Sequence, residues 1–259
     1  MNKRARLALS FGLVVIATSL LLLFASMIER PADKAKAFPR GMIVVGVDAG
    51  VPPFASDDGQ AVYGLDIDLA HAIARDIDLP IRFLNIGYYG LYDALTSGEV
   101  DLLISALRVE EARMDDVRYT RHYFDNGLLL VTPVEKPIAS LDGLAGKKVA
   151  YEFGSQADTE LRKLEEQYGP VTRLPYELPT YALDSLRFEY ADAAIVDAIA
   201  LRLYLRRFAD WRVAQRYLTR DHYAIAARRD NRDAWALVDG ALAALKEKGE
   251  LDKIIAMWL

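Results

Sequence analysis

The stretch "DALTSGEVDLLIS", Asp93–Ser105, carries the pattern that decides the fold. A short helical segment stops at Gly98, and an aspartate then leads into an apolar run that is too short for a free-standing helix. A second stretch, "DSLRFEYADAAIV" from Asp184 to Val196, aligns with the first without a gap. Each stretch predicts a helix, a turn and a buried parallel strand. The pair is interpreted either as ordinary copies of a βα unit or as equivalent parts of two similar lobes.

The rest of the chain continues this alternation of strands and helices. Strands are predicted at residues 42–47, 81–86, 100–105, 147–152, 171–176, 192–196 and 222–228. Helices are predicted at residues 64–77, 89–98, 155–169, 180–190, 197–208 and 232–249. Repeated βα units indicate an α/β fold with mostly parallel sheets and right-handed crossovers. Open sheets of this kind bind ligands beyond the carboxyl ends of their strands, which here are Ser105-Ala106 and Val196-Asp197.

The N-terminus carries the pattern of an export segment. A basic flank, "KRAR", precedes 22 uncharged residues from Leu7 to Ile28. Residues 1–30 are interpreted either as a cleaved signal peptide or as an uncleaved anchor in which residues 7–28 cross the inner membrane. Both interpretations predict that the rest of the chain is periplasmic. Residues 31–41, "PADKAKAFPRG", are polar, bounded by prolines and without periodicity, so they are predicted to form a linker.

Composition excludes several classes of protein. The chain of 259 residues contains no cysteine, which excludes disulfides, zinc–thiolate sites and a thiol nucleophile. Residues 1–30 carry a net charge of +3, so the stated total of −5 leaves −8 for the remainder, and such acidity argues against nucleic acid as a partner. The three histidines have no metal-ligand spacing, and no nucleotide-binding loop or nucleophile elbow is present in the sequence. We therefore expect no cofactor and no metal.

Seven segments, in order, are similar to one known family. They are "VGVDAGVPPFA", "VYGLDIDLAHAIA", "ALTSGEVDLLIS", "EEAR", "GLAGKKVAYEFGS", "ADAAIVD" and "ALKEKGELDKIIAMW". With them, the chain from residue 42 to its end resembles the bacterial extracellular solute-binding proteins of family 3, which supply polar amino acids to ABC transporters. The resemblance implies a monomeric receptor that binds an amino acid or a related small zwitterion and delivers it to an ABC transporter permease.

The resemblance also implies the type II periplasmic-binding-protein fold. In this fold each of two lobes is a mostly parallel sheet flanked by helices, and the lobes close around a ligand in the cleft between them. Lobe one is expected to comprise residues 40–132 and 221–259, and lobe two residues 133–220. The chain would then cross between the lobes near Thr132-Pro133 and return near Arg220-His222.

Two charged residues match the family's contacts to the ligand backbone. Arg113 corresponds to the arginine that grips an α-carboxylate, for which a planar guanidinium is well suited. Its alternative role is a surface salt bridge with Glu110. Asp197 corresponds to the aspartate that accepts the α-ammonium, and its alternative role is to cap the helix that follows it.

Further ligand contacts are implied around the cleft. Asp48 follows the first strand where the family places a side-chain contact, and Tyr88 lies where an aromatic ring packs on the ligand. Tyr88 has the alternative role of core filler. The remaining expected contacts are Ser105, Ala106 and Gln156.

Three positions depart from the family pattern. Arg108 stands where threonine or serine is usual, Glu152 where a basic or neutral residue is usual, and Val51 where an aromatic ring often stacks on the ligand. Arg108 and Glu152 belong to opposite lobes, so they either pair across the closed cleft as a latch or recognise complementary charges on the ligand. The class of the ligand's side chain is left open.

Two rival functions are compatible with the same scaffold. One is an enzyme resembling the periplasmic cyclohexadienyl dehydratases, with Glu152 or Asp48 as a general acid. The other is a ligand-sensing module anchored through residues 7–28. No catalytic motif is present, and the sequence stops directly after its final predicted helix. A non-enzymatic, stand-alone receptor is therefore the expectation.

Overall fold

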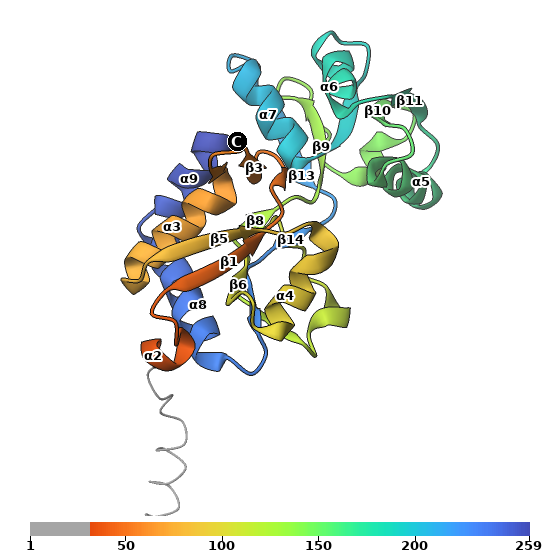
Figure 1. The fold of residues 1–259 in the computed structure, drawn as a ribbon. Coiled ribbons are helices and arrows are strands. Elements are labelled where there is room, and N and C mark those ends of the chain that lie inside the picture. Colours follow the sequence, from red (N-terminus) through yellow and green to blue (C-terminus); the bar gives the residue numbers. More distant parts are fainter. Residues whose placement is uncertain (1–31) are drawn as a thin grey trace, which may run out of the picture. The chain divides into compact units, whose positions relative to one another are not determined.

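Two five-stranded sheets organise the computed structural model, which describes residues 32–259. The strand order is β5-β1-β6-β15-β7 in the first sheet and β11-β10-β12-β9-β13 in the second. In each sheet the fourth strand runs antiparallel to both of its neighbours, and the other pairs are parallel. The two sheets therefore share one topology, and the predicted two-lobed α/β fold is confirmed (Figure 1).

The first lobe is built from residues at both ends of the described chain. Its main strands are β1 (Ile43–Val47), β5 (Ile81–Asn85), β6 (Leu102–Leu103), β7 (Val117–Tyr119) and β15 (Ala226–Arg228). Its helices are α2 (Lys34–Ala37), α3 (Leu65–Ile77), α4 (Leu91–Ser97), α8 (Arg232–Glu247) and α9 (Glu250–Trp258), with the 3-10 turns η1 (Tyr88–Gly90) and η2 (Glu111–Arg113). A small sheet of β2 (Gly50–Val51), β3 (Ala55–Asp57) and β4 (Val62–Tyr63) lies beside it.

The second lobe is built from one continuous segment. Its strands are β9 (Leu128–Pro133), β10 (Lys148–Glu152), β11 (Thr172–Tyr176), β12 (Ala193–Asp197) and β13 (Val213–Tyr217). Its helices are α5 (Gln156–Tyr168), α6 (Pro179–Arg187) and α7 (Ala198–Arg207), with the 3-10 turn η3 (Leu141–Leu144). The short strands β8 (Phe124–Asp125) and β14 (His222–Tyr223) pair with each other where the chain passes between the two sheets.

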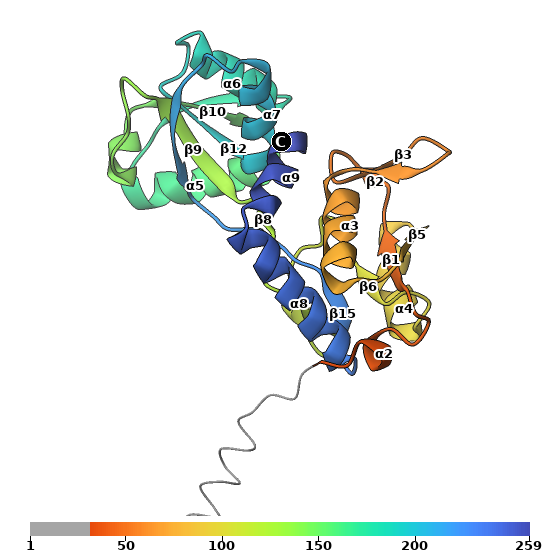
Figure 2. The same ribbon diagram turned by 90° about the vertical axis from the view of Figure 1, so that its left-hand side faces the viewer.

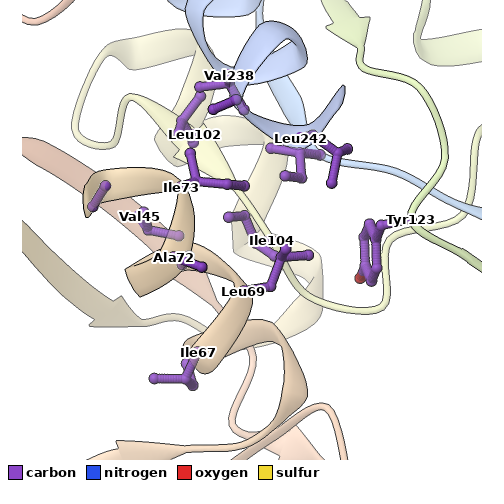
Figure 3. Packing of buried hydrophobic residues seen from close by; sticks show 14 of the residues in the cluster. Val45, Ile67, Leu69, Ala72, Ile73, Leu102, Ile104, Tyr123, Val238 and Leu242 are labelled. Atoms are coloured by element: carbon purple, nitrogen blue, oxygen red, sulfur yellow. The ribbon is translucent and has the colours of Figure 1, made fainter. Parts of the chain in front are cut away.

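Strand β1 is buried on both sides because helices cover both faces of the first sheet. Val45 packs with α3 and α8 in one core, where Leu69, Ile73 and Leu242 also lie (Figure 3). Val44 packs in a second core with residues of α4 on the opposite face. Figure 2 shows α8 and α9 running one after the other along this lobe. The second sheet has cores on both faces in the same way.

The crossings between the sheets lie at a close approach of two backbone segments. A Cβ placed on Gly127 would lie 2.0 Å from the carbonyl oxygen of Thr219. The predicted first crossing at Thr132-Pro133 falls inside β9, which is hydrogen-bonded to β12 and β13 throughout the second sheet. The apolar run of β9 is therefore a core strand of the second lobe, and the crossing lies nearer Asn126.

The predicted linker, residues 31–41, is corrected by the structure. Lys34–Ala37 form α2, and Phe38 is only 1% exposed in the core of the first lobe. The amide of Asn231 donates a hydrogen bond to the Ala37 carbonyl, at 2.9 Å. A helix of four residues is too short to show a hydrophobic period, which is why the sequence pattern resembled a linker.

The remaining differences concern strands. Strands β2, β3, β4, β7, β8, β9 and β13 had no counterpart among the predicted elements, and the predicted strand at 222–228 is divided into β14 and β15. Strands of two or three residues are too short to show alternation. The export segment predicted at residues 1–30 lies outside the described residues. From residue 32 onward, the helices include none with both the length and the apolarity needed to cross a membrane.

Candidate functional site

A pocket of about 180 Å³ lies where β10 and β12 end. Glu152 is the last residue of β10 and Asp197 the last of β12, and these parallel strands bring their carboxyl ends to the same edge of the sheet. Other lining residues come from β9 and β12, from the start of α5, from α6, from the crossing segment and from the first lobe. They are Arg108, Asn126, Leu128, Ser155, Gln156, Ala157, Pro179, Ile195 and Val196.

The predicted site residues divide into two groups. Four of them line this pocket, namely Arg108, Glu152, Gln156 and Asp197. The other five belong to the first lobe and do not line it, namely Asp48, Tyr88, Ser105, Ala106 and Arg113. The structure therefore brings together the residues that the sequence assigned to the second lobe, with Arg108 facing them.

Arg108 is held by the return crossing. Its Nε lies 2.9 Å from Oδ2 of Asp221, and its backbone forms an isolated bridge with Tyr223. Burial raises the pKa of the Asp221 carboxyl, while the nearby Arg108 charge lowers it. Because Arg108 pairs with Asp221 in this structure, it is not paired with Glu152, its other candidate partner.

The second lobe contributes two carboxylates. Burial and the negative charge of Asp197 raise the pKa of Glu152 above its usual value. Oδ1 of Asp197 accepts the N–H of Ala200 at 2.9 Å, so Asp197 caps α7 as one of its two predicted roles requires. The cap fixes the position of the Asp197 carboxylate at the pocket wall.

At the ends of β1 and β6, three of the first-lobe candidates are linked. Ser105 Oγ accepts the Asp48 N–H at 2.9 Å. The Asp48 carboxylate accepts the N–H groups of Gly50 at 3.0 Å and of Tyr88 at 3.1 Å. Tyr88 is 41% exposed and its hydroxyl donates to Glu110 at 3.1 Å, so its ring is not core filler.

Arg113 makes local contacts. Its Nε lies 3.9 Å from Oε2 of Glu110, and its guanidinium lies 4.6 Å from the centre of the Tyr92 ring. The salt bridge that the sequence offered as the alternative role of Arg113 is therefore present. An exposed pair of this kind contributes little to stability, so it leaves Arg113 available to rearrange.

Two polar residues near the site were not identified from the sequence. Asp66 is fully buried at the start of α3, and its Oδ2 accepts the Ala106 N–H at 2.6 Å. Asn126 lines the pocket, and its Oδ1 accepts the Ile199 N–H at 3.0 Å. A charged residue directly after the first apolar residue of a helix was the available signal for Asp66, whereas nothing in the local pattern distinguished Asn126 from a turn residue.

The structure also brings together two histidines that are far apart in the sequence. The rings of His122 and His222 stack with their centres 4.2 Å apart beside the β8–β14 pair. Among residues 32–259 no group of three or more histidine, aspartate and glutamate side chains is arranged to hold a metal ion.

Two lobes of matching topology, joined by paired crossings and carrying a small polar pocket at the strand ends, define the class of two-lobed solute-binding proteins. The family model described as bacterial extracellular solute-binding proteins, family 3, matches residues 43–259, and the chain belongs to this family. The resemblance predicted from the sequence is thereby confirmed, and the chain is a solute-binding receptor by family.

Curated relatives carry the names of amino-acid-binding proteins. The arginine-binding extracellular protein ArtP of Bacillus subtilis is 26% identical, over 83% of this chain and 85% of its own. ABC transporter arginine-binding protein 1 of Escherichia coli is 27% identical, over 82% and 88%. The probable histidine-binding protein of Neisseria gonorrhoeae is 27% identical, over 88% and 87%. These relatives are named as binding proteins, in keeping with the non-enzymatic expectation.

Solved structures agree on the fold. Substrate-binding domain 2 of Lactococcus lactis GlnP in its open conformation has a TM-score of 0.68 at 24% identity, covering 85% of this chain and 95% of its own. The unliganded, open L-cystine receptor of Neisseria gonorrhoeae has a TM-score of 0.73 at 19% identity, covering 86% and 94%.

Proposed function

We propose that this protein captures an amino acid by closure of its two lobes and delivers it to the permease of an ABC transporter. The observation that carries the proposal is the pocket at the ends of β10 and β12, with Asp197 fixed by its cap on one side and Arg108 on the other. The Asp197 carboxylate matches the α-ammonium of a zwitterion, and a guanidinium from the first lobe would match its α-carboxylate. The names of the relatives support an amino acid as the ligand.

The proposed contacts follow from the charges. Asp197 accepts the α-ammonium through its carboxylate. Arg113 leaves Glu110 and binds the α-carboxylate when the lobes close, with the turn at Ser105-Ala106 beneath it. Tyr88 and Asp48 line the first-lobe side, and Gln156 the second-lobe side.

The proposed closing motion uses the two crossings. The β8–β14 pair and the close approach of Gly127 to Thr219 confine the connection to a short region, as a hinge requires. We further propose that the receptor acts as a periplasmic monomer. It would be released by cleavage of residues 1–30 or held at the inner membrane through residues 7–28.

A thermal-shift screen of the full-length chain against the proteinogenic amino acids tests this function. A ligand at a hundred times its dissociation constant adds about 2.7 kcal/mol of stability, which raises the melting temperature by several degrees. D197N is expected to lose most of that shift, whereas D210N, an exposed control on the same lobe, is expected to keep it. If no amino acid in the panel raises the melting temperature of the folded protein, the proposal is overturned.

A further inference from the structure

The charges that line the pocket do not balance. Glu152 and Asp197 are its two acidic lining residues, and Arg108 is the one basic residue among them. Arg108 is already paired with Asp221 at 2.9 Å, so its positive charge is matched outside the lining. The other lining residues are uncharged. The pocket therefore presents an excess of negative charge to a ligand.

Glu152 lacks the partner that such a residue normally has. Within the described residues its carboxylate has no ion pair and no hydrogen bond, whereas Asp197 accepts the Ala200 N–H. The charge of Asp197 acts on Glu152 and has the same sign. A partly buried carboxylate next to another carboxylate is unfavourable unless a cation binds between or beside them.

The geometry of the sheet places the two carboxylates next to each other. Strands β10 and β12 are parallel neighbours, with Tyr151 paired to Ile195, so Glu152 lies one residue and Asp197 two residues beyond that pair. Both residues end their strands, and both line the same pocket of about 180 Å³. One small ligand in this pocket can therefore contact both carboxylates.

We propose that Glu152 is a specificity-determining residue that selects an amino acid whose side chain carries a cationic group in addition to the α-ammonium. The inference rests on the proposed function, in which Asp197 takes the α-ammonium. Glu152 then takes the side-chain cation, and binding of a neutral side chain leaves the Glu152 carboxylate unpaired. Such a penalty discriminates against neutral amino acids without any steric clash.

Isothermal titration calorimetry with two pairs of ligands, each pair differing in the charge of the side chain, tests the assignment. L-arginine and L-citrulline differ by a guanidinium and a neutral ureido group of nearly the same shape, and L-lysine and Nε-acetyl-L-lysine differ in charge at the same atom. The full-length wild-type chain is expected to bind one of the cationic ligands at least tenfold more tightly than its neutral partner. E152Q keeps the size of the side chain, and we expect the preference to fall to threefold or less while affinity for the neutral partner is retained.

The control variant is E166Q. Glu166 is an exposed acidic residue of α5 that does not line the pocket, so E166Q is expected to keep the full preference for the cationic ligand. Equal affinities within both pairs, tightest binding of some neutral amino acid, or an undiminished preference in E152Q would each overturn the role of Glu152 and leave the receptor function standing. Failure to bind any amino acid would instead count against the proposed function itself.

Discussion

Asp66 shows how a single buried residue supports the first-lobe side of the site. Its Oδ2 accepts the Ala106 N–H at 2.6 Å, and Ala106 has a φ of 43°, which a residue with a side chain rarely adopts. Burial raises the pKa of Asp66 to about 7, against a partial lowering by the Ala106 N–H.

We expect D66N to change the pH dependence of stability. The usual pKa of this carboxyl is 3.8, so the folded protein binds the Asp66 proton more tightly than the unfolded chain does. The free energy of unfolding of the wild type should therefore fall as pH rises from about 4 to 7 and remain reduced above pH 7. D66N cannot ionise and keeps an acceptor for Ala106, so it should be more stable than wild type at pH 8, by up to about 4 kcal/mol.

Urea unfolding of both proteins at pH 5, 6, 7 and 8 measures this difference. It should shrink steadily toward pH 5, where the wild-type carboxyl is mostly protonated. A difference that stays constant over this range would show that Asp66 does not titrate in the folded protein.

Individual site residues differ in how far the sequence could identify them. Asp197 and Glu152 end strands in recognisable βα units, so their position at the pocket follows from local pattern. Arg108 also reaches the pocket, but its partner Asp221 lies 113 positions further along the chain, and no local rule links the two. The roles of Asp48, Tyr88, Ser105, Ala106 and Arg113 depend on closure and stay predictions.

At the scale of elements, helices and strands were predicted correctly where the hydrophobic periodicity extended over enough residues to be recognised. The helices predicted at residues 64–77 and 155–169 correspond to α3 and α5, and α5 begins after Ser155, whose Oγ accepts the Ala157 N–H at 3.1 Å. The failures are α2 and the short strands, because four residues or fewer carry no period. Strands β9 and β13 are longer exceptions, because the continuous burial of β9 and the mixed burial of β13 gave no alternating pattern.

Phe38 tests whether α2 and its flank belong to the folded lobe. F38A removes a ring from a residue that is 1% exposed. Because a packed core only partly fills the cavity that remains, we expect the free energy of unfolding to fall by about 3–5 kcal/mol. F153A removes a ring that is 70% exposed and serves as the matched control, with a change near zero. Chemical denaturation compares the two, and an equally small effect of both would restore the linker interpretation.

Two glycines test the packing at the crossing. In G127A the new Cβ would lie 2.0 Å from the backbone oxygen of Thr219, so the crossing must shift and stability should fall by about 1–3 kcal/mol. Gly240 lies in the interior of α8, where an added Cβ would enter open space, so G240A should gain up to about 1 kcal/mol in helix stability. Melting temperatures should move in opposite directions, and a fall of equal size in both would contradict this account of Gly127.

At the scale of the whole molecule, the echo between Asp93–Ser105 and Asp184–Val196 corresponds to equivalent places in two sheets of the same topology. The first stretch runs through α4 into β6, and the second through α6 into β12, each ending at a strand next to the antiparallel member of its sheet. Sequence could predict this repetition because each copy is local. The sequence could not determine where the chain crosses between the lobes, because the apolar pattern of a strand such as β9 is compatible with either sheet.

The central claim is that ligand binding closes the lobes, and Förster energy transfer across the cleft measures closure most directly. The chain has no cysteine, so D93C on α4 and Q167C on α5 give one exposed labelling site in each lobe. Addition of the amino acid that binds in calorimetry should change the transfer efficiency in a saturable way with the same dissociation constant, and D197N should need much higher concentrations. An efficiency that does not change while the ligand is bound would contradict the account.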